Sequence, residues 1–140
     1  MQPYVSVITL GVAELERSKR FYTEGFGWTP ACANEEIVFY QLNGLVLGTF
    51  LTAALEADMN RTGLVRPGAF ALAHNVRTRE EVAPLMERLV RAGGTVTRPP
   101  DAPPHGGFRG YLLDPDEHPW EIAWNPGFAM DEAGNVTFGV

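Results

Sequence analysis

The amino-acid sequence predicts an α+β fold in which two βαβββ modules form one cupped mixed sheet around a shared cleft. Two observations lead to this prediction. The order strand, helix, strand, strand, strand occurs twice along the 140 residues, with Val7 of the first copy matching Ala71 of the second. One copy alone would leave a sheet face bare, and two copies side by side bury it. The expected organisation is a first module (1–55), a linker (56–68), a second module (69–126) and a C-terminal tail (127–140).

The first module opens with a strand and a helix. Tyr4–Val12 is a predicted strand, in which Val5, Val7 and Thr9 share one face and Ser6, Ile8 and Leu10 share the other. Leu15–Phe26 follows with its apolar residues near one stripe and its charges mostly elsewhere, which predicts an amphipathic helix. Gly27 comes directly after this segment, and glycine commonly ends a helix.

A hairpin completes the first module, after a short extended segment over Trp28–Ala33. Asn43 and Gly44 separate the apolar runs Glu36–Leu42 and Leu45–Leu51. Asn-Gly in this position predicts a type I′ turn, in which both central residues have positive φ. The linker after the hairpin is polar and rich in Gly and Pro, with a helical turn at its start.

The second module repeats this order. Ala69–Val76 is a predicted strand, and Thr78–Ala92 is a predicted helix that begins with a Thr-x-x-Glu capping box and carries a clear apolar stripe. Thr95–Arg98 is extended, and Pro99–Gly107 has the composition of a loop. In the tail, a Gly-Asn pair predicts one more hairpin.

The closing strand pair, Phe108–Leu113 and Trp120–Asn125, surrounds an Asp-Pro-Asp-Glu turn. Alternation in the last strand places Trp120 and Ile122 on one face and Glu121 on the other. If the apolar face packs under a helix, Glu121 points into the space that the opposite side of the sheet encloses.

The composition excludes several classes of function. The formal net charge is −6 and no cluster of Lys or Arg occurs, which argues against nucleic acids and membranes as partners. The one cysteine, Cys32, can form neither an internal disulfide nor a cysteine metal cluster. The sequence shows no signal peptide and no apolar run approaching about 18 residues. We therefore expect a cytoplasmic protein.

Two sets of motifs carry a resemblance to a known family. The first half contributes Val12–Leu15, Ser18, Phe21–Tyr22 and Gly27–Trp28. The second half contributes Leu113–Glu121, with Glu117 where the family usually has Gly. These motifs resemble the vicinal oxygen chelate superfamily, also called the glyoxalase/bleomycin-resistance/dioxygenase family, from Val5 to about Pro126. The chain also looks like a glyoxalase-like bacterial subgroup without an assigned reaction.

The resemblance implies a divalent metal held from the first and last strand of each module. Placed by the flanking motifs, the four positions fall on Val7, the strand Leu45–Leu51, Ala71 and Glu121. Only Glu121 has a ligating side chain, whereas such sites normally have about three protein ligands. His74 does not fill the gap, because it lies three residues from Ala71 and therefore on the opposite face. We expect no metal and no other cofactor.

The polar residues that remain around the cleft are candidates for a site. Glu121 is the candidate acid/base, because a carboxyl among apolar neighbours suits proton transfer or ligand hydrogen bonding. The resemblance places Arg109 and Tyr111 on the same side, where Arg109 can clamp an anionic group while Glu121 takes a hydroxyl or amine. Thr9 follows the first empty metal position by two residues and faces inward too. His105, on the loop that covers the cleft, is a further candidate acid or base.

Each candidate also has a structural interpretation. Glu121 can simply pair with Arg109, Thr9 is a good strand former, and His105 can be a solvent-exposed loop residue. His118 and His74 are predicted to be structural histidines, one in the Asp-Pro-Asp turn and one facing the core. The three tryptophans are predicted to be core residues.

Two functions fit these observations. The first is a metal-independent binder of a small-molecule ligand, similar to bleomycin-resistance and other sequestering members of the family. The alternative is a metal-independent enzyme of lyase, isomerase or transferase type, using Glu121 with Tyr111 or His105. A second titratable group within reach of Glu121 would favour the enzyme. A third possibility is a protein-interaction module with a vestigial cleft. Resemblance and the open sheet edges predict a homodimer.

Overall fold

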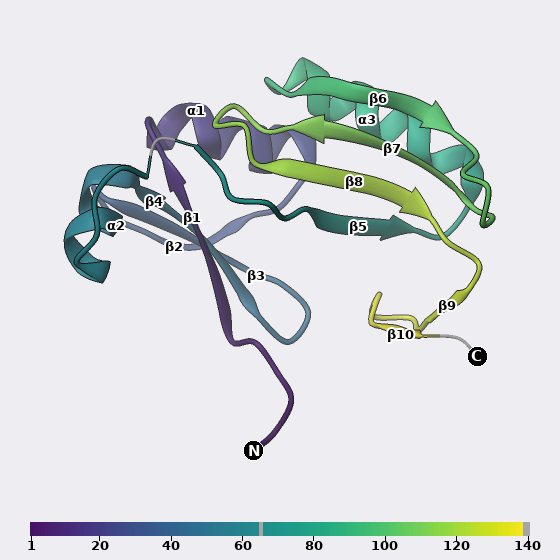
Figure 1. The fold of residues 1–140 in the computed structure, drawn as a ribbon, viewed down its shortest axis with the longest axis horizontal. Coiled ribbons are helices and arrows are strands. Elements are labelled where there is room, and N and C mark those ends of the chain that lie inside the picture. Colours follow the sequence, from purple (N-terminus) through teal and green to yellow (C-terminus); the bar gives the residue numbers. More distant parts are fainter. Residues whose placement is uncertain (65, 139–140) are drawn as a thin grey trace.

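The computed structural model describes residues 1–64 and 66–138 of the chain (Figure 1). The strands of the first module are β1 (Val7–Val12), β2 (Pro30–Ala33), β3 (Ile37–Gln41) and β4 (Val46–Leu51). Those of the second are β5 (Leu72–Val76), β6 (Thr95–Asp101), β7 (Phe108–Leu113) and β8 (Pro119–Trp124). The helical elements are α1 (Leu15–Arg20), η1 (Phe21–Gly25), α2 (Thr52–Met59), η2 (Arg79–Glu81) and α3 (Val82–Arg91). The tail forms β9 (Phe128–Met130) and β10 (Val136–Phe138).

The two modules have the same strand connectivity. The first forms a four-stranded sheet of order β1-β4-β3-β2, and the second forms one of order β5-β8-β7-β6. In each sheet the first strand runs parallel to the last strand, and the remaining pairs are antiparallel. These two mixed sheets, each with its own helix, confirm the α+β prediction and the double βαβββ order (Figure 1).

One hydrophobic core is shared by both modules. Burial alternates along the strands as predicted: Leu10 and Val12 are buried in β1, and Trp120 and Ile122 are buried in β8. The helices meet over this core, since a Cβ built on Gly25 of η1 would lie only 2.7 Å from a methyl carbon of Leu89 in α3. Only glycine allows this approach. The faces that carry Thr9 and Glu121 are turned away from the core.

The Asp-Pro-Asp turn between β7 and β8 joins the modules through a buried network. The hydroxyl of Tyr22 donates a hydrogen bond of 2.6 Å to Asp114, and the Trp120 indole donates one of 3.2 Å to the Tyr22 hydroxyl. The other oxygen of Asp114 accepts the backbone N–H groups of Asp116 and His118. Burial raises the pKa of the Asp114 carboxyl, because the charged form loses its hydration.

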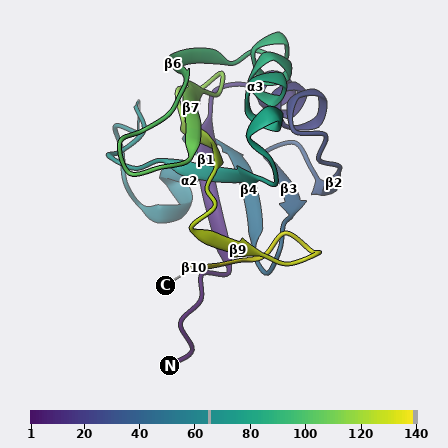
Figure 2. The same ribbon diagram turned by 90° about the vertical axis from the view of Figure 1, so that its right-hand side faces the viewer.

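The C-terminal hairpin β9–β10 lies across the ends of both modules (Figure 2). The Asn43 side chain, in the β3–β4 turn, donates to the backbone oxygen of Ala133. The Arg77 guanidinium, just after β5, donates to the backbone oxygens of Asp131 and Glu132 at 2.9 and 3.1 Å. The predicted tail hairpin is therefore confirmed, and it closes one end of the space between the modules.

Several local predictions need correction. The predicted first helix is present, but after α1 it continues as a single π-helical turn, η1. The Asn43-Gly44 hairpin is present, but only Gly44 has a positive φ, 75°, so the turn is not type I′. Pro99 and Pro100 belong to β6 rather than to a loop. Proline is tolerated there because β6 is an edge strand.

The segment after β4 is also more regular than predicted. The expected helical turn is an eight-residue helix, α2, which ends at Asn60 with a left-handed φ of 58°. Within the described residues, no helix is both long enough and apolar enough to cross a membrane.

Candidate functional site

The centre of the candidate site is a pair formed by Glu121 and Tyr111. These residues are directly opposite each other on β8 and β7. The Tyr111 hydroxyl donates a hydrogen bond of 2.5 Å to the Oε2 atom of Glu121. This hydrogen bond, and then partial burial, raise the pKa of Tyr111. The proton therefore stays on the phenol, and Glu121 retains its Oε1 atom for a ligand.

Arg109 shares this face but has a different partner. It pairs with Asp101 of β6, and Arg98 donates to the other oxygen of the same carboxylate at 2.8 Å. The expected structural pair of Arg109 with Glu121 is therefore replaced by an Arg98–Asp101–Arg109 cluster. Only 18% of the Arg109 side chain is exposed. The site face thus has a carboxylate with a phenol at one place and, beside it, two guanidinium groups that share one carboxylate.

A cavity of about 950 Å³ adjoins Glu121, and we call it the Glu121 cavity. Its walls come from the β3–β4 hairpin, β5, β8 and the C-terminal hairpin. The lining residues are Trp28, Gln41, Leu42, Asn43, Leu45, Ala73, His74, Asn75, Glu121, Asn125, Phe128, Ala133, Gly134, Asn135 and Val136. A small molecule fits such a volume, which lies in the usual range for ligand sites.

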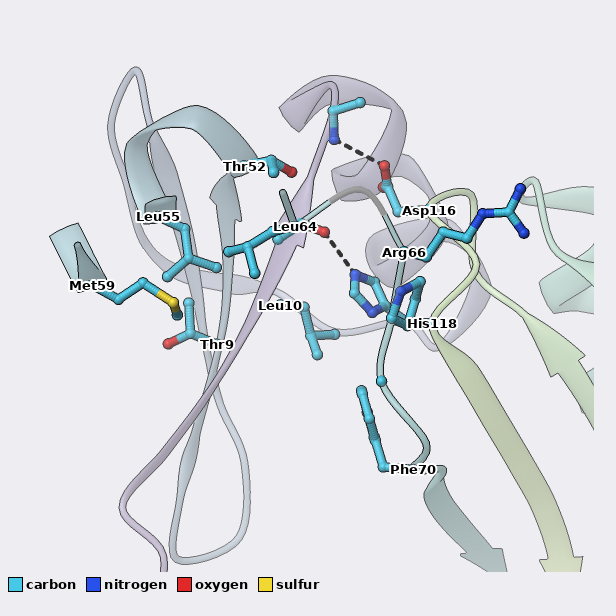
Figure 3. A pocket seen from close by; sticks show the side chains of 14 residues that line it. Thr9, Leu10, Thr52, Leu55, Met59, Leu64, Arg66, Phe70, Asp116 and His118 are labelled. Carbon is cyan, nitrogen blue, oxygen red and sulfur yellow. Dashed lines mark hydrogen bonds between the residues drawn. The ribbon is translucent and has the colours of Figure 1, made fainter. Parts of the chain in front are cut away.

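Thr9 lies in a different cavity of about 450 Å³, which we call the Thr9 pocket (Figure 3). Leu55 and Met59 of α2 form one side, and Phe70 forms another. His118 at its edge donates from Nε2 to the backbone oxygen of Gly11 at 2.7 Å, which ties the turn to β1. His118 is buried, so its predicted structural role is supported.

His105 lines neither of these two cavities. It is an exposed residue in the short loop between β6 and β7. The structure therefore brings Glu121 and Tyr111 together, places Arg109 on the same face, and separates Thr9 and His105 from them.

Several residues of the Glu121 cavity were not among the predicted site residues. His74 faces the core as predicted, at a ring distance of 5.4 Å from Phe26, yet it also borders the cavity. Asn75 follows it on β5, and Asn125 comes directly after β8. Strand pairing could have indicated that β5 contributes to the site, because Ala73 of β5 is the direct partner of Glu121. Strand periodicity did not indicate that the C-terminal hairpin would line the cavity.

The side chains at the inherited metal positions do not fit a divalent metal. Val7 and Ala71 have no donor atom, and β4 contains no His, Asp or Glu. Across residues 1–64 and 66–138, no group of three His, Cys, Asp or Glu side chains has an arrangement that would hold a metal ion. Glu121 would be a lone protein ligand, where about three are usual.

Comparison with known proteins finds a matching family and similar solved structures. The sequence profile described as Glyoxalase/Bleomycin resistance protein/Dioxygenase superfamily matches residues 4–122. A crystal structure of a glyoxalase-related enzyme from Fulvimarina pelagi is 58% identical, with a TM-score of 0.97 over 99% of this chain and 100% of that chain. No curated protein matches the chain.

More distant solved structures share the fold alone. A lactoylglutathione lyase from Agrobacterium tumefaciens is 21% identical, with a TM-score of 0.70 over 89% of this chain and 96% of that chain. The fosfomycin resistance protein FosX from Mesorhizobium loti is also 21% identical, with a TM-score of 0.67 over 89% of this chain and 94% of that chain.

Proposed function

The chain belongs to the glyoxalase/bleomycin resistance protein/dioxygenase superfamily, and we propose that it binds a small molecule in the Glu121 cavity without the family's usual divalent metal. The observation that carries this proposal is the pairing of Glu121 with Tyr111 beside a cavity of about 950 Å³. A binding site needs a shaped, largely apolar space with a few fixed polar groups. Here the phenol orients the carboxylate, and Leu42, Leu45 and Phe128 supply apolar wall.

The test of this proposal is a thermal-shift screen of small amines, alcohols, carboxylates and phosphates on four proteins. Wild type is compared with Glu121→Gln and Tyr111→Phe, which change the polar pair, and with Thr9→Val, which changes the other pocket. We expect hits whose stabilisation falls in the first two variants and persists in the third. Hits that stabilise all four proteins equally would place the site elsewhere, and the protein-interaction module would become the better hypothesis.

Metal independence has its own measurement. Elemental analysis of untagged protein is expected to find no stoichiometric Zn, Ni, Mn or Fe. One equivalent of metal that is lost in Glu121→Gln would show that other residues complete a metal site around this carboxylate.

A metal-independent enzyme is the second candidate function, and a specific observation favours it. The second titratable group that acid/base catalysis requires is present, since the Tyr111 hydroxyl is 2.5 Å from Glu121. A relative that is 58% identical is described as a glyoxalase-related enzyme. Turnover of a screening hit, followed by mass spectrometry, distinguishes the candidates. A binder leaves the hit unchanged, whereas an enzyme converts it and loses most of its rate in Glu121→Gln.

We also propose a homodimer in the cytoplasm. The strands β1 and β5 are at the edges of their sheets, and open edges favour pairing with another chain. Large apolar side chains near the two chain ends are exposed, among them Tyr4, Val5, Val7 and Phe138. Sedimentation at micromolar concentration tests the dimer, and a mass of 15.4 kDa would count against it.

An exposed free Cys32 is compatible with a reducing compartment such as the cytoplasm, which cell fractionation tests.

A further inference from the structure

The Glu121 cavity has an unusual charge pattern for a site expected to clamp an anion. Among its lining residues in the described part of the chain, Glu121 is the single formally charged one, and Lys and Arg do not occur. Burial lowers the pKa of His74, which favours the neutral form of this imidazole. The nearby guanidinium of Arg77 is engaged with the backbone of the C-terminal hairpin and does not line the cavity.

Arg109 does not compensate for this charge. It shares the outer face of the sheet with Glu121, but it is outside the cavity lining and pairs with Asp101. An anion in the cavity would therefore meet a carboxylate without a facing cation. Like charges at short range in a partly desolvated space repel.

Three of the side-chain amides at the rim have an N–H group in use and keep their oxygen free. Gln41 donates its amide N–H groups to the backbone oxygens of Leu42 and Leu45 at 2.9 and 3.3 Å. The amide of Asn43 donates to Ala133, and that of Asn135 donates to Asp131 at 3.0 Å. The oxygens of these three amides are available as hydrogen-bond acceptors, whereas Asn125 uses its oxygen to accept the backbone N–H of Gly127 at 3.2 Å.

An aromatic wall completes the pattern. Trp28 lines the cavity and stacks on the Phe26 ring at a centroid distance of 4.3 Å. This stack fixes the indole in place. A cation near an aromatic face gains further electrostatic stabilisation.

We propose that the Glu121 cavity selects ligands whose polar end is a protonated amine. The inference rests on the proposed binding function and names the chemical class of its ligand. The ammonium group donates to Glu121 Oε1, because Oε2 already accepts the Tyr111 hydroxyl. Amide oxygens at the rim accept its remaining N–H groups or those of a neighbouring hydroxyl. The apolar part of the ligand lies against Ala73, Leu45 and Phe128.

The experiment uses three probes of nearly equal shape: benzylamine, benzyl alcohol and benzoate. Their dissociation constants are measured by NMR titration with the full-length protein at pH 7. We expect benzylamine to bind best and benzoate worst, with a difference of at least about tenfold, as expected for a hydrogen bond to a charged group. Glu121→Gln should weaken benzylamine by about tenfold and leave benzyl alcohol nearly unchanged.

Glu87→Gln is the matched control, because it removes the same charge from an exposed position on α3. It should not alter the preference, whereas an equal loss in both variants would indicate attraction by net charge and overturn the proposal. Benzoate binding as tightly as benzylamine, with both dependent on Tyr111, would overturn the amine preference but not the binding function. Binding of no probe, or equal binding in all variants, would overturn both.

Discussion

The outer faces of the two modules differ although the order and pairing of their strands match. In the first module the strand register pairs Thr9 with Gly48, and in the second it pairs Ala73 with Glu121. Gly48 is covered by the ring of Phe39, since an added Cβ would lie 3.1 Å from a ring carbon. The position that carries the carboxylate in one module is therefore a closed apolar position in the other.

The repeated fold therefore has the same geometry in its two halves but not the same chemistry. Backbone hydrogen bonds determine which side of a sheet each position faces, so Gly48 and Glu121 point away from the core in the same way. The side chain then decides what the position can do. Family membership predicts the place of a site, whereas its ligand has to be inferred from the residues of the second module and the tail.

The largest expected effect comes from a change in the Asp-Pro-Asp turn. This turn belongs to the second module and accepts a hydrogen bond from Tyr22 of the first. Asp114→Ala would leave the Tyr22 hydroxyl and two backbone N–H groups without their acceptor. Each buried group left unsatisfied costs about 1–3 kcal/mol, so we expect the free energy of unfolding to fall by about 3 kcal/mol or more. Urea denaturation measures this loss, and both modules should unfold in one transition because they share a core.

The control for this variant is Asp131→Ala, which removes a carboxylate from an exposed turn of the tail. Its unfolding midpoint should move much less than that of Asp114→Ala. Two separate transitions in the Asp114→Ala protein would break the view of the modules as one cooperative unit.

Gly48→Ala tests the closed position of the first module. The new methyl group would press on the Phe39 ring, so we expect a loss of about 1 kcal/mol despite the entropic benefit that replacing glycine usually brings. Phe39→Leu provides room, and in that background Gly48→Ala should cost less or become stabilising. Thermal unfolding of the four proteins forms a double-mutant cycle. An additive cycle would show that the ring does not restrict the position.

The sequence predicts the parts of this comparison that depend on local pattern. Alternation over Trp120–Trp124 is sufficient to orient Glu121. The family resemblance implied that Tyr111 is on the same side, and the observed register pairs it directly with Glu121. The cavity is different, because its walls include β5, the Asn43 turn and the tail. No periodicity relates those segments, and only tertiary packing brings them together.

Similar reasoning explains the local errors. Asn43 lacks the positive φ of a type I′ turn, and its side chain donates to the backbone oxygen of Ala133 in the tail, a contact that turn propensity does not include. Pro99 and Pro100 were predicted to form a loop because proline disfavours strands in general, but an edge strand does not need every N–H group. The partner of Arg109 is Asp101 on that same strand, so an error in the strand boundary also concealed the charge cluster.

A smaller effect is expected from pH. The hydrogen bond to Glu121 raises the pKa of Tyr111, so this phenol should ionise later than an ordinary tyrosine. Because the pKa of Tyr111 is raised in the folded state, its hydrogen bond contributes fully to stability below the unfolded pKa of about 10. This contribution is lost as pH rises through the folded pKa. Glu121→Gln should lower the pKa of Tyr111, because it removes the charged acceptor whose hydrogen bond to the phenol raises that pKa most. Absorbance titration measures the pKa of Tyr111, with Tyr111→Phe as the reference. Identical titration curves for wild type and Glu121→Gln would contradict the pairing of Tyr111 with Glu121.

The smallest expected effect is that of Arg109→Ala, and it decides how far the chemistry of the second module extends beyond Glu121. Arg109 and Asp101 form a partly exposed ion pair, which contributes at most about 1 kcal/mol to folding. Because Arg109 is outside the cavity lining, benzylamine affinity should change by less than about threefold. Arg98→Ala is the matched control, since it removes the other guanidinium from the same carboxylate. If Arg109→Ala alone weakens benzoate by about tenfold or more, an anionic group does reach Arg109. The site would then extend across the face of β7, and the amine would be one end of a ligand with two charges.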